Sequence, residues 1–240
     1  MSILLHLGDS VIRVKRYADH LIINKEKGEL TLSKFGQKIY AQKLPWCDDV
    51  IGTTTEICLA INAAYTEEKL RDISSLDTFK SREPASYKLP IYFKEGEDCE
   101  SVIAELNRYD SSLGINTHRQ FVDYISSLSL KVGMFGFMPG FIYIDGLPAS
   151  FSMPRKSIPS KSVPAGSLAI GGPYIGLYSY PSPGGWHIIA QSAINLTITD
   201  ISKHLAIGDT ITIDPITSEA YESIRNDRLS FQIYNQLHDA

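Results

Sequence analysis

The sequence of 240 residues has few cysteines and no long apolar run. Its three cysteines, Cys47, Cys58 and Cys99, are scattered and odd in number, which excludes a disulfide framework and the paired spacing of a zinc knuckle. Free thiols are typical of a reducing compartment, so a cytoplasmic protein is expected. No apolar run approaches the roughly 20 residues that a membrane-spanning helix needs, and no membrane partner is expected.

Secretory, nucleic-acid-binding and nucleotide-binding signals are also missing. The first nine residues contain a short apolar run but neither a cationic segment nor a cleavage site, so they do not predict a signal peptide. The formal net charge of −4 and the lack of a long basic run argue against a nucleic-acid partner. Without a Walker-type glycine-rich loop, we expect no cofactor and no ATP to bind tightly to this chain alone. The six histidines lack metal-ligand spacing, so no metal site is expected.

What is present fits a soluble globular protein with one large domain or two ordinary ones, since 43% of the residues are hydrophobic and 21% charged. Strands and helices alternate in the first third, which predicts a small two-layer α+β domain over residues 1–84. The expected elements are strands at 10–17, 21–24 and 56–62, a helix at 28–44, and a helix capped by Thr66. A polar stretch at 77–87 predicts the linker.

The second part begins with a strand at 88–93 and a helix at 97–109. Thr117 and Gln120 predict a capping box for the next helix, with a buried face at Phe121, Tyr124, Ile125 and Leu128. From residue 130 onward the pattern is almost wholly β. Many short strands separated by Gly and Pro turns predict a closed barrel or sandwich over residues 85–220. The expected strands are 131–137, 141–144, 167–171, 174–180, 186–191, 193–199 and 210–214. Residues 221–240 are expected to form a C-terminal tail, helical or loosely held.

Three segments of the barrel place proline and glycine beside large apolar side chains: 136–141, 163–167 and 181–186. Solvated loops rarely need such rings, and regular strands rarely tolerate so much Pro and Gly. The combination predicts the rim of a substrate- or partner-binding cleft. The candidate cleft residues are Phe137, Pro139, Gly140, Phe141, Arg155, Lys156, Pro164, Gly166, Ser167, Ser182, Gly184, Gly185 and Trp186.

Several of these residues have two interpretations. Arg155 and Lys156 could hold a carboxylate or phosphate, or form a solvated basic turn. The rings of Phe137 and Phe141 could line the cleft or fill the barrel core, whereas Trp186 is favoured at the rim. His187 is not expected to be catalytic, and the sequence identifies no catalytic residue.

Six motifs together resemble a known family: Gly136-Phe-Met-Pro-Gly-Phe, Gly146-Leu-Pro, Pro154-Arg155, Val163-Pro-Ala-Gly-Ser, Gly176-Leu-Tyr and Ser182-Pro-Gly-Gly-Trp. Their order and spacing over residues 88–216 are similar to subunit 1 of allophanate hydrolase, the B subunit of bacterial 5-oxoprolinase, and the Kip-type inhibitor of a sporulation histidine kinase. The resemblance implies a small N-terminal α+β domain followed by a C-terminal cyclophilin-like β-barrel. It also implies a partner of related cyclophilin-like architecture, either the C subunit of 5-oxoprolinase or subunit 2 of allophanate hydrolase.

The first function that the resemblance implies is a subunit of an ATP-dependent 5-oxoprolinase, which converts 5-oxoproline to glutamate. This chain would form a half-site with the C subunit, and the whole complex would use ATP. The alternatives are a non-enzymatic inhibitor that binds a histidine kinase, and a carboxyltransferase-like half of an allophanate hydrolase or urea carboxylase system. Ile125 stands where the family usually carries His, and Ser160 and Ser162 flank Lys161 where the family tends to have Arg. These departures favour the inhibitor. A cyclophilin-like fold alone does not imply prolyl isomerase activity, and none is expected.

Overall fold

The protein is represented by a computed structural model that describes residues 2–76, 83–194, 204–227 and 230–238. The chain divides into two compact units, Met1–Glu83 and Pro84–Ala240. Each unit has its own hydrophobic core. The fold is α+β, as the sequence predicts, and its second unit contains a closed barrel.

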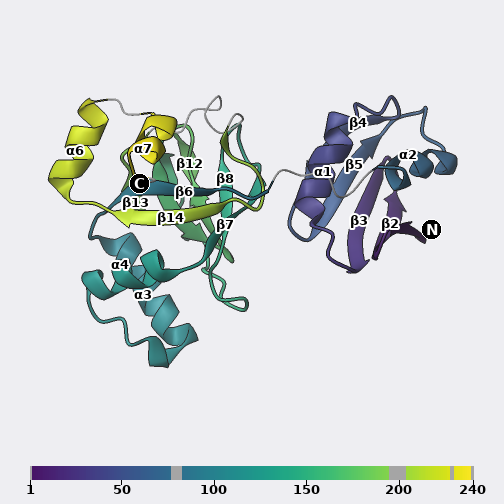
Figure 1. The fold of residues 1–240 in the computed structure, drawn as a ribbon. Helices are drawn as coiled ribbons and strands as arrows, with labels where there is room; N and C mark the ends of the chain where they lie inside the picture. Colours follow the sequence, from purple (N-terminus) through teal and green to yellow (C-terminus); the bar gives the residue numbers. More distant parts are fainter. Residues whose placement is uncertain (1, 77–82, 195–203, 228–229, 239–240) are drawn as a thin grey trace. The chain divides into compact units, whose positions relative to one another are not determined.

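The first unit is an antiparallel five-stranded sheet in the order β1-β2-β3-β5-β4 (Figure 1). Helix α1 (Leu32–Ala41) packs its buried Phe35 and Ile39 against this sheet. A single 3-10 turn (Glu67–Lys69) leads into the short helix α2 (Leu70–Ser74). The strands are β1 (Ser2–Leu7), β2 (Ser10–Tyr17), β3 (His20–Lys27), β4 (Cys47–Gly52) and β5 (Glu56–Ile61).

In this unit one strand was not predicted and two local predictions need correction. The short apolar run at the start is a sheet-edge strand, β1, which the sequence left unassigned. Helix α1 begins at Leu32, four residues later than the predicted start at Gly28. Gly28 has a positive φ of 92°, which is not helical, and it follows the last residue of strand β3. Thr66 precedes the 3-10 turn without a side-chain capping bond.

The second unit is built on a seven-stranded closed barrel in the order β10-β11-β8-β7-β14-β6-β13, with β13 pairing back onto β10. Six of the seven pairings are antiparallel, and β14 runs parallel to β6. The strands are β6 (Ser86–Phe93), β7 (Leu130–Phe135), β8 (Ile142–Asp145), β10 (Ser167–Gly171), β11 (Tyr174–Leu177), β13 (His187–Ser192) and β14 (Thr210–Pro215).

Two helices, α3 (Glu97–Tyr109) and α4 (His118–Ser127), lie together beside the barrel (Figure 1). The predicted capping box is confirmed, since Thr117 Oγ1 accepts from the Gln120 amide and the Gln120 side chain accepts from the Thr117 amide. On the predicted buried face of α4, Phe121 and Ile125 are fully buried, while Tyr124 and Leu128 are partly buried.

The end of the chain is more ordered than the loosely held alternative. Helix α6 (Ser218–Asn226) is followed by α7 (Phe231–His238). Phe231 and Tyr234 are buried in the barrel core, and Tyr234 donates a hydrogen bond to Asp214 of β14. These contacts make α7 part of the second unit, and α6 belongs to it through its contact with β6.

The strand predictions for the barrel differ from the structure mainly at the loops. The expected strand at 131–137 ends at Phe135, and the expected strand at 174–180 ends at Leu177. Each strand is followed by a loop that leads into a predicted cleft segment, 136–141 or 181–186. Two short strands that the sequence did not predict, β9 (Ser160–Val163) and β12 (Ser182–Gly184), pair with each other in a separate ribbon. Of the expected strand at 193–199, residues 195–199 lie outside the described part of the chain.

Candidate functional site

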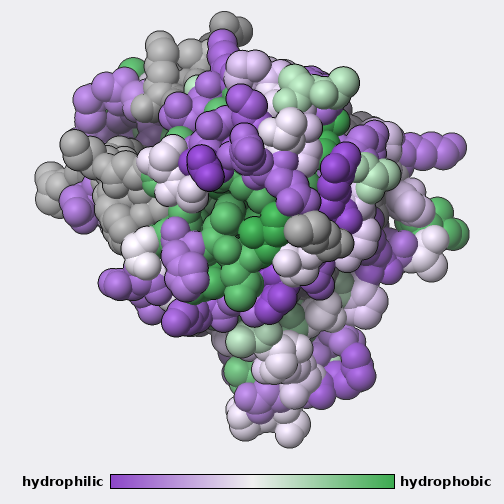
Figure 2. Space-filling model, turned by 90° about the vertical axis from the view of Figure 1, so that its right-hand side faces the viewer, coloured by the Kyte–Doolittle hydropathy of each residue, from purple (hydrophilic) through white to green (hydrophobic). Residues whose placement is uncertain are grey.

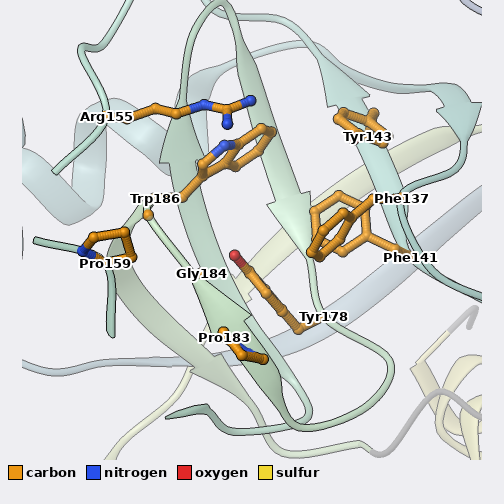
Figure 3. A pocket seen from close by; sticks show the side chains of 10 residues that line it. Phe137, Phe141, Tyr143, Arg155, Pro159, Tyr178, Pro183, Gly184 and Trp186 are labelled. Atoms are coloured by element: carbon orange, nitrogen blue, oxygen red, sulfur yellow. The ribbon is translucent and has the colours of Figure 1, made fainter. Parts of the chain in front are cut away.

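Two of the three cleft segments meet at one hollow of about 260 Å³ on the barrel unit (Figure 3). Half of its lining residues are aromatic, and one is an arginine. The lining residues are Phe137, Phe141, Tyr143, Arg155, Pro159, Tyr178, Pro183, Gly184, Gly185 and Trp186. The third segment, 163–167, contributes no lining residue.

The loop between β7 and β8 supplies two phenylalanines with different environments. Phe141 is buried, with 1% of its surface exposed, whereas Phe137 is 63% exposed. Phe137 also has a φ of 64°, a conformation that costs an L-residue free energy and is often found at functional sites. The two rings meet edge to face with centroids 5.3 Å apart. From the sequence, both residues could line the cleft or fill the barrel core. The structure places Phe137 at the rim of the hollow and Phe141 in its buried wall.

The buried wall is a cluster of edge-to-face rings around Phe141, which contacts Tyr143, Tyr178 and Trp186 at centroid distances of 4.8, 4.9 and 5.8 Å. Trp186 is 9% exposed, so it lines the hollow from inside and does not stand free on its rim. Two strand glycines make room for the indole. A Cβ on Gly171 would lie 2.4 Å from the Trp186 ring, and one on Gly176 would lie 2.6 Å from it.

Two phenols add polar groups to the aromatic walls. Burial raises the pKa of both Tyr143 and Tyr178, although the positive charge of Arg155 opposes that rise in each case. Both hydroxyls therefore stay protonated near neutral pH and can donate hydrogen bonds. In Figure 3 the Tyr178 hydroxyl points toward the centre of the hollow.

Arg155 is the cation of the hollow. Its side chain extends alongside Trp186 toward the interior (Figure 3). Among the described residues no carboxylate forms an ion pair with it, whereas Arg13 in the first unit is paired with Glu26. A guanidinium that faces aromatic walls without an internal counter-ion is available to an anionic ligand. Arg155 is exposed to solvent and also lines the hollow, so the anion site remains a prediction.

Lys156, which the sequence paired with Arg155, is used differently. Its Nζ donates to Asp98 Oδ2 at 3.0 Å and to Ser160 Oγ at 2.8 Å, and its side chain does not line the hollow. These two hydrogen bonds engage the ammonium of Lys156 outside the hollow, so only Arg155 of the two cations reaches the ligand space.

Several other predicted cleft residues lie outside the lining. Ser167 is fully buried, and its hydroxyl donates to Gln191 Oε1 at 3.1 Å. Gly166 has a φ of 81° and serves the turn that precedes β10. The predicted residues that do not line the hollow are Pro139, Gly140, Lys156, Pro164, Gly166, Ser167 and Ser182.

Sequence reasoning did not select four of the lining residues: Tyr143, Pro159, Tyr178 and Pro183. Tyr178 lies within the Gly176-Leu-Tyr motif, and Pro183 within the Ser182-Pro-Gly-Gly-Trp motif, so both had a sequence signal. Tyr143 also had a signal, because it lies two residues after Phe141 in the predicted strand 141–144 and residues i and i+2 of a strand share one face.

The positions that depart from the family pattern do not line the hollow. Ile125 is fully buried in the core between α4 and the barrel. Ser160 accepts the Lys156 hydrogen bond, and Ser162 is exposed on β9. These replacements therefore leave the described lining of the hollow intact.

Apolar side chains are also exposed elsewhere on the surface. In the first unit they include Leu4, Tyr17, Tyr40 and Ile51. Figure 2 shows one face of the molecule, on which a hydrophobic area is surrounded by hydrophilic residues.

No helix in the described part of the chain has both the length and the apolar character of a bilayer span. The described residues contain no group of three His, Cys, Asp or Glu side chains placed to hold a metal ion.

Comparison with known proteins agrees with this fold. Residues 15–203 match the family model of the carboxyltransferase domain, subdomain C and D. A segment of 80 residues is 41% identical to the B subunit of 5-oxoprolinase from Escherichia coli O157:H7 and covers 33% of this chain and 37% of that protein.

Two solved structures share the fold at low sequence identity. The crystal structure of TTHA0988 superposes with a TM-score of 0.62 at 20% identity, covering 83% of this chain and 40% of that one. The urea carboxylase of Kluyveromyces lactis does so with a TM-score of 0.59 at 15% identity, covering 94% of this chain and 24% of that one. With its barrel, its aromatic hollow and a family match over most of its length, the chain belongs to the carboxyltransferase subdomain C and D family, the group of the 5-oxoprolinase B subunit and allophanate hydrolase subunit 1.

Proposed function

We propose that the hollow binds a small carboxylate and that the chain is the B-type subunit of an ATP-dependent 5-oxoprolinase, which opens 5-oxoproline to glutamate. The observation that carries this proposal is Arg155, the cation of an aromatic hollow, without an ion-pair partner among the described residues. The name of the partly aligned relative, the B subunit of 5-oxoprolinase, supports the choice of reaction.

The chemistry of the hollow suits this substrate. 5-Oxoproline is a small flat lactam ring with one carboxylate. Arg155 can accept that carboxylate in two parallel N–H···O bonds, while the faces of Phe141 and Trp186 cover the ring. The protonated hydroxyl of Tyr178 can donate to the lactam oxygen. A hydroxyl aimed at that oxygen would stabilise negative charge that develops there as the amide bond opens.

The hollow is open to solvent on the side of Phe137, which fits a half-site. A C-type subunit, a partner of related cyclophilin-like architecture, would close it and exclude bulk water, while the one water that ring opening consumes supplies the OH of the new carboxyl group and the H of the amine. The chain has no Walker-type loop, so we assign ATP binding to another component of the complex.

The test is reconstitution of the complex by co-expression with A-type and C-type subunits, followed by assay of ATP hydrolysis that depends on 5-oxoproline. In Arg155→Met the KM for 5-oxoproline should rise about 10- to 150-fold, the range expected for losing a charged hydrogen-bonding partner. The matched control is Lys161→Met, which removes an exposed cation of nearby strand β9 and should leave KM unchanged. Turnover that does not require this chain, or a wild-type KM in Arg155→Met, would refute the proposal.

The exposed rim favours a second candidate, the non-enzymatic inhibitor of a histidine kinase. Phe137 and Ile158 are 63% and 83% exposed, and large exposed apolar side chains are typical anchors of protein interfaces. If this candidate is right, the purified chain lowers kinase autophosphorylation and Phe137→Ala abolishes the effect. Unchanged autophosphorylation of every kinase tested from the same host would remove it.

A further inference from the structure

The loop that carries Arg155 has no regular secondary structure between Pro154 and Pro159, yet it is attached to the barrel on both sides of the arginine. The carbonyl of Pro154, one residue before, lies 3.1 Å from His187 Nε2. The amide of Lys156, one residue after, donates to the carbonyl of Gly185 at 2.8 Å. Both peptide groups that flank Arg155 are therefore tied to the segment that carries Trp186.

A partly buried carboxylate joins the same attachments. Asp98, near the start of α3, accepts from Lys156 Nζ at 3.0 Å and from the Ile188 amide at 2.9 Å through its Oδ2. Its Oδ1 lies 3.7 Å from His187 Nδ1. The side chains of His187, Lys156 and Asp98 are only 11%, 17% and 27% exposed. The partly shielded ion pair of Lys156 with Asp98 is screened less than a fully exposed pair.

The hydrogen bond of His187 fixes the position of one proton. A backbone carbonyl can only accept, so Nε2 carries the hydrogen and donates it to Pro154. Nδ1 is then left buried without a hydrogen-bond partner, facing the Asp98 carboxylate. A buried polar atom without a partner is costly, and such costs are tolerated most often where they serve a functional arrangement.

We propose that Asp98, Lys156 and His187 are positioning residues that hold Arg155 in the hollow. This inference rests on the proposed function of Arg155 as the carboxylate-binding group. Asp98 anchors Lys156 and lies against His187, and these two residues fix the peptide groups before and after the guanidinium. The arrangement also keeps the second cation out of the hollow, so that one carboxylate meets one guanidinium. Preorganised attachment of this kind lowers the entropic cost of ligand binding.

The test compares Asp98→Asn, His187→Phe and the conservative His187→Gln in the full chain. Glu100→Gln, which removes an exposed carboxylate from the same turn of α3, is the matched control. Two readouts are measured: hydrogen exchange of the Lys156 amide, which needs no ligand, and the KM and kcat for 5-oxoproline in the reconstituted complex. Melting temperatures identify any variant that fails to fold.

In Asp98→Asn, exchange of the Lys156 amide should accelerate about tenfold or more, as expected for loss of a charged hydrogen bond, and in His187→Phe, which loses a neutral hydrogen bond, by about two- to tenfold. KM should rise by a similar factor while kcat changes less than twofold. His187→Gln keeps a donor for the Pro154 carbonyl and should restore most of both values. Unchanged exchange in folded Asp98→Asn and His187→Phe overturns the positioning role. If exchange accelerates but no variant changes KM, the loop attachment is real and the proposed role of Arg155 is wrong.

Discussion

The sharpest prediction concerns Gly176, the residue of β11 that lies beneath the aromatic wall. A Cβ at this position would lie 2.5 Å from Phe141 Cζ and 2.6 Å from Trp186 Cζ3, both below any normal carbon contact. Gly176 does not have a positive φ, so alanine is allowed by the backbone and the perturbation is one of packing alone. Phe141 and Trp186 are both buried and touch each other, so a ring displaced by the new methyl group can move only toward the hollow.

Gly176→Ala should therefore destabilise the barrel unit by about 1–3 kcal/mol, the usual cost of adding a methyl group to a filled core. At a typical urea dependence of about 1–3 kcal/mol per molar, the midpoint moves down by roughly 1 M. The shift should also push Phe141 or Trp186 into the hollow and weaken binding of any ligand there.

Urea unfolding followed by circular dichroism measures this change, with two transitions fitted if the two units unfold separately. Gly136→Ala is the control, because its Cβ would lie 3.6 Å from the Tyr143 ring, an ordinary contact, and its effect should stay within about 0.5 kcal/mol. A Gly176→Ala protein as stable as the wild type would show that the ring cluster is not packed as described.

Three further predictions concern the scaffold. Phe231→Ala should cost about 3–5 kcal/mol in urea unfolding, because this ring of α7 is fully buried in the barrel core, and a loss below about 1 kcal/mol would mean that α7 is not docked. Thr117→Ala should cost about 1 kcal/mol by removing one half of the α4 capping box, whereas an unchanged urea midpoint would contradict it. Burial raises the pKa of the Cys99 thiol to about 12 from an ordinary 9.0, so its neutral form favours the folded state. That contribution is complete below about pH 9 and is lost as the pH rises toward 12, so the wild type should lose stability over this range faster than Cys99→Ala, and equal pH profiles would refute the assignment.

The sequence alone determined the elements whose signals are local. Helix α3 has the predicted bounds, and the capping box of Thr117 and Gln120 marked the start of α4, because side chains and backbone groups a few residues apart decide such features. The alternation of β14 likewise follows from a period-two pattern that needs no distant partner. The six spaced motifs were enough to identify the family, since they carry the turns and rings of the barrel loops.

Only the tertiary structure separated the functional residues from their neighbours. Arg155 and Lys156 are adjacent and alike in sequence, but Asp98, more than fifty residues earlier, binds Lys156 and leaves Arg155 to the hollow. Trp186 reaches the site by packing over Gly171 and Gly176 of two other strands, whereas the Ser167 hydroxyl bonds to Gln191 inside the protein. The physical reason is that a binding site is a meeting of side chains from distant segments, and their directions are set by packing and hydrogen bonds that no local pattern records.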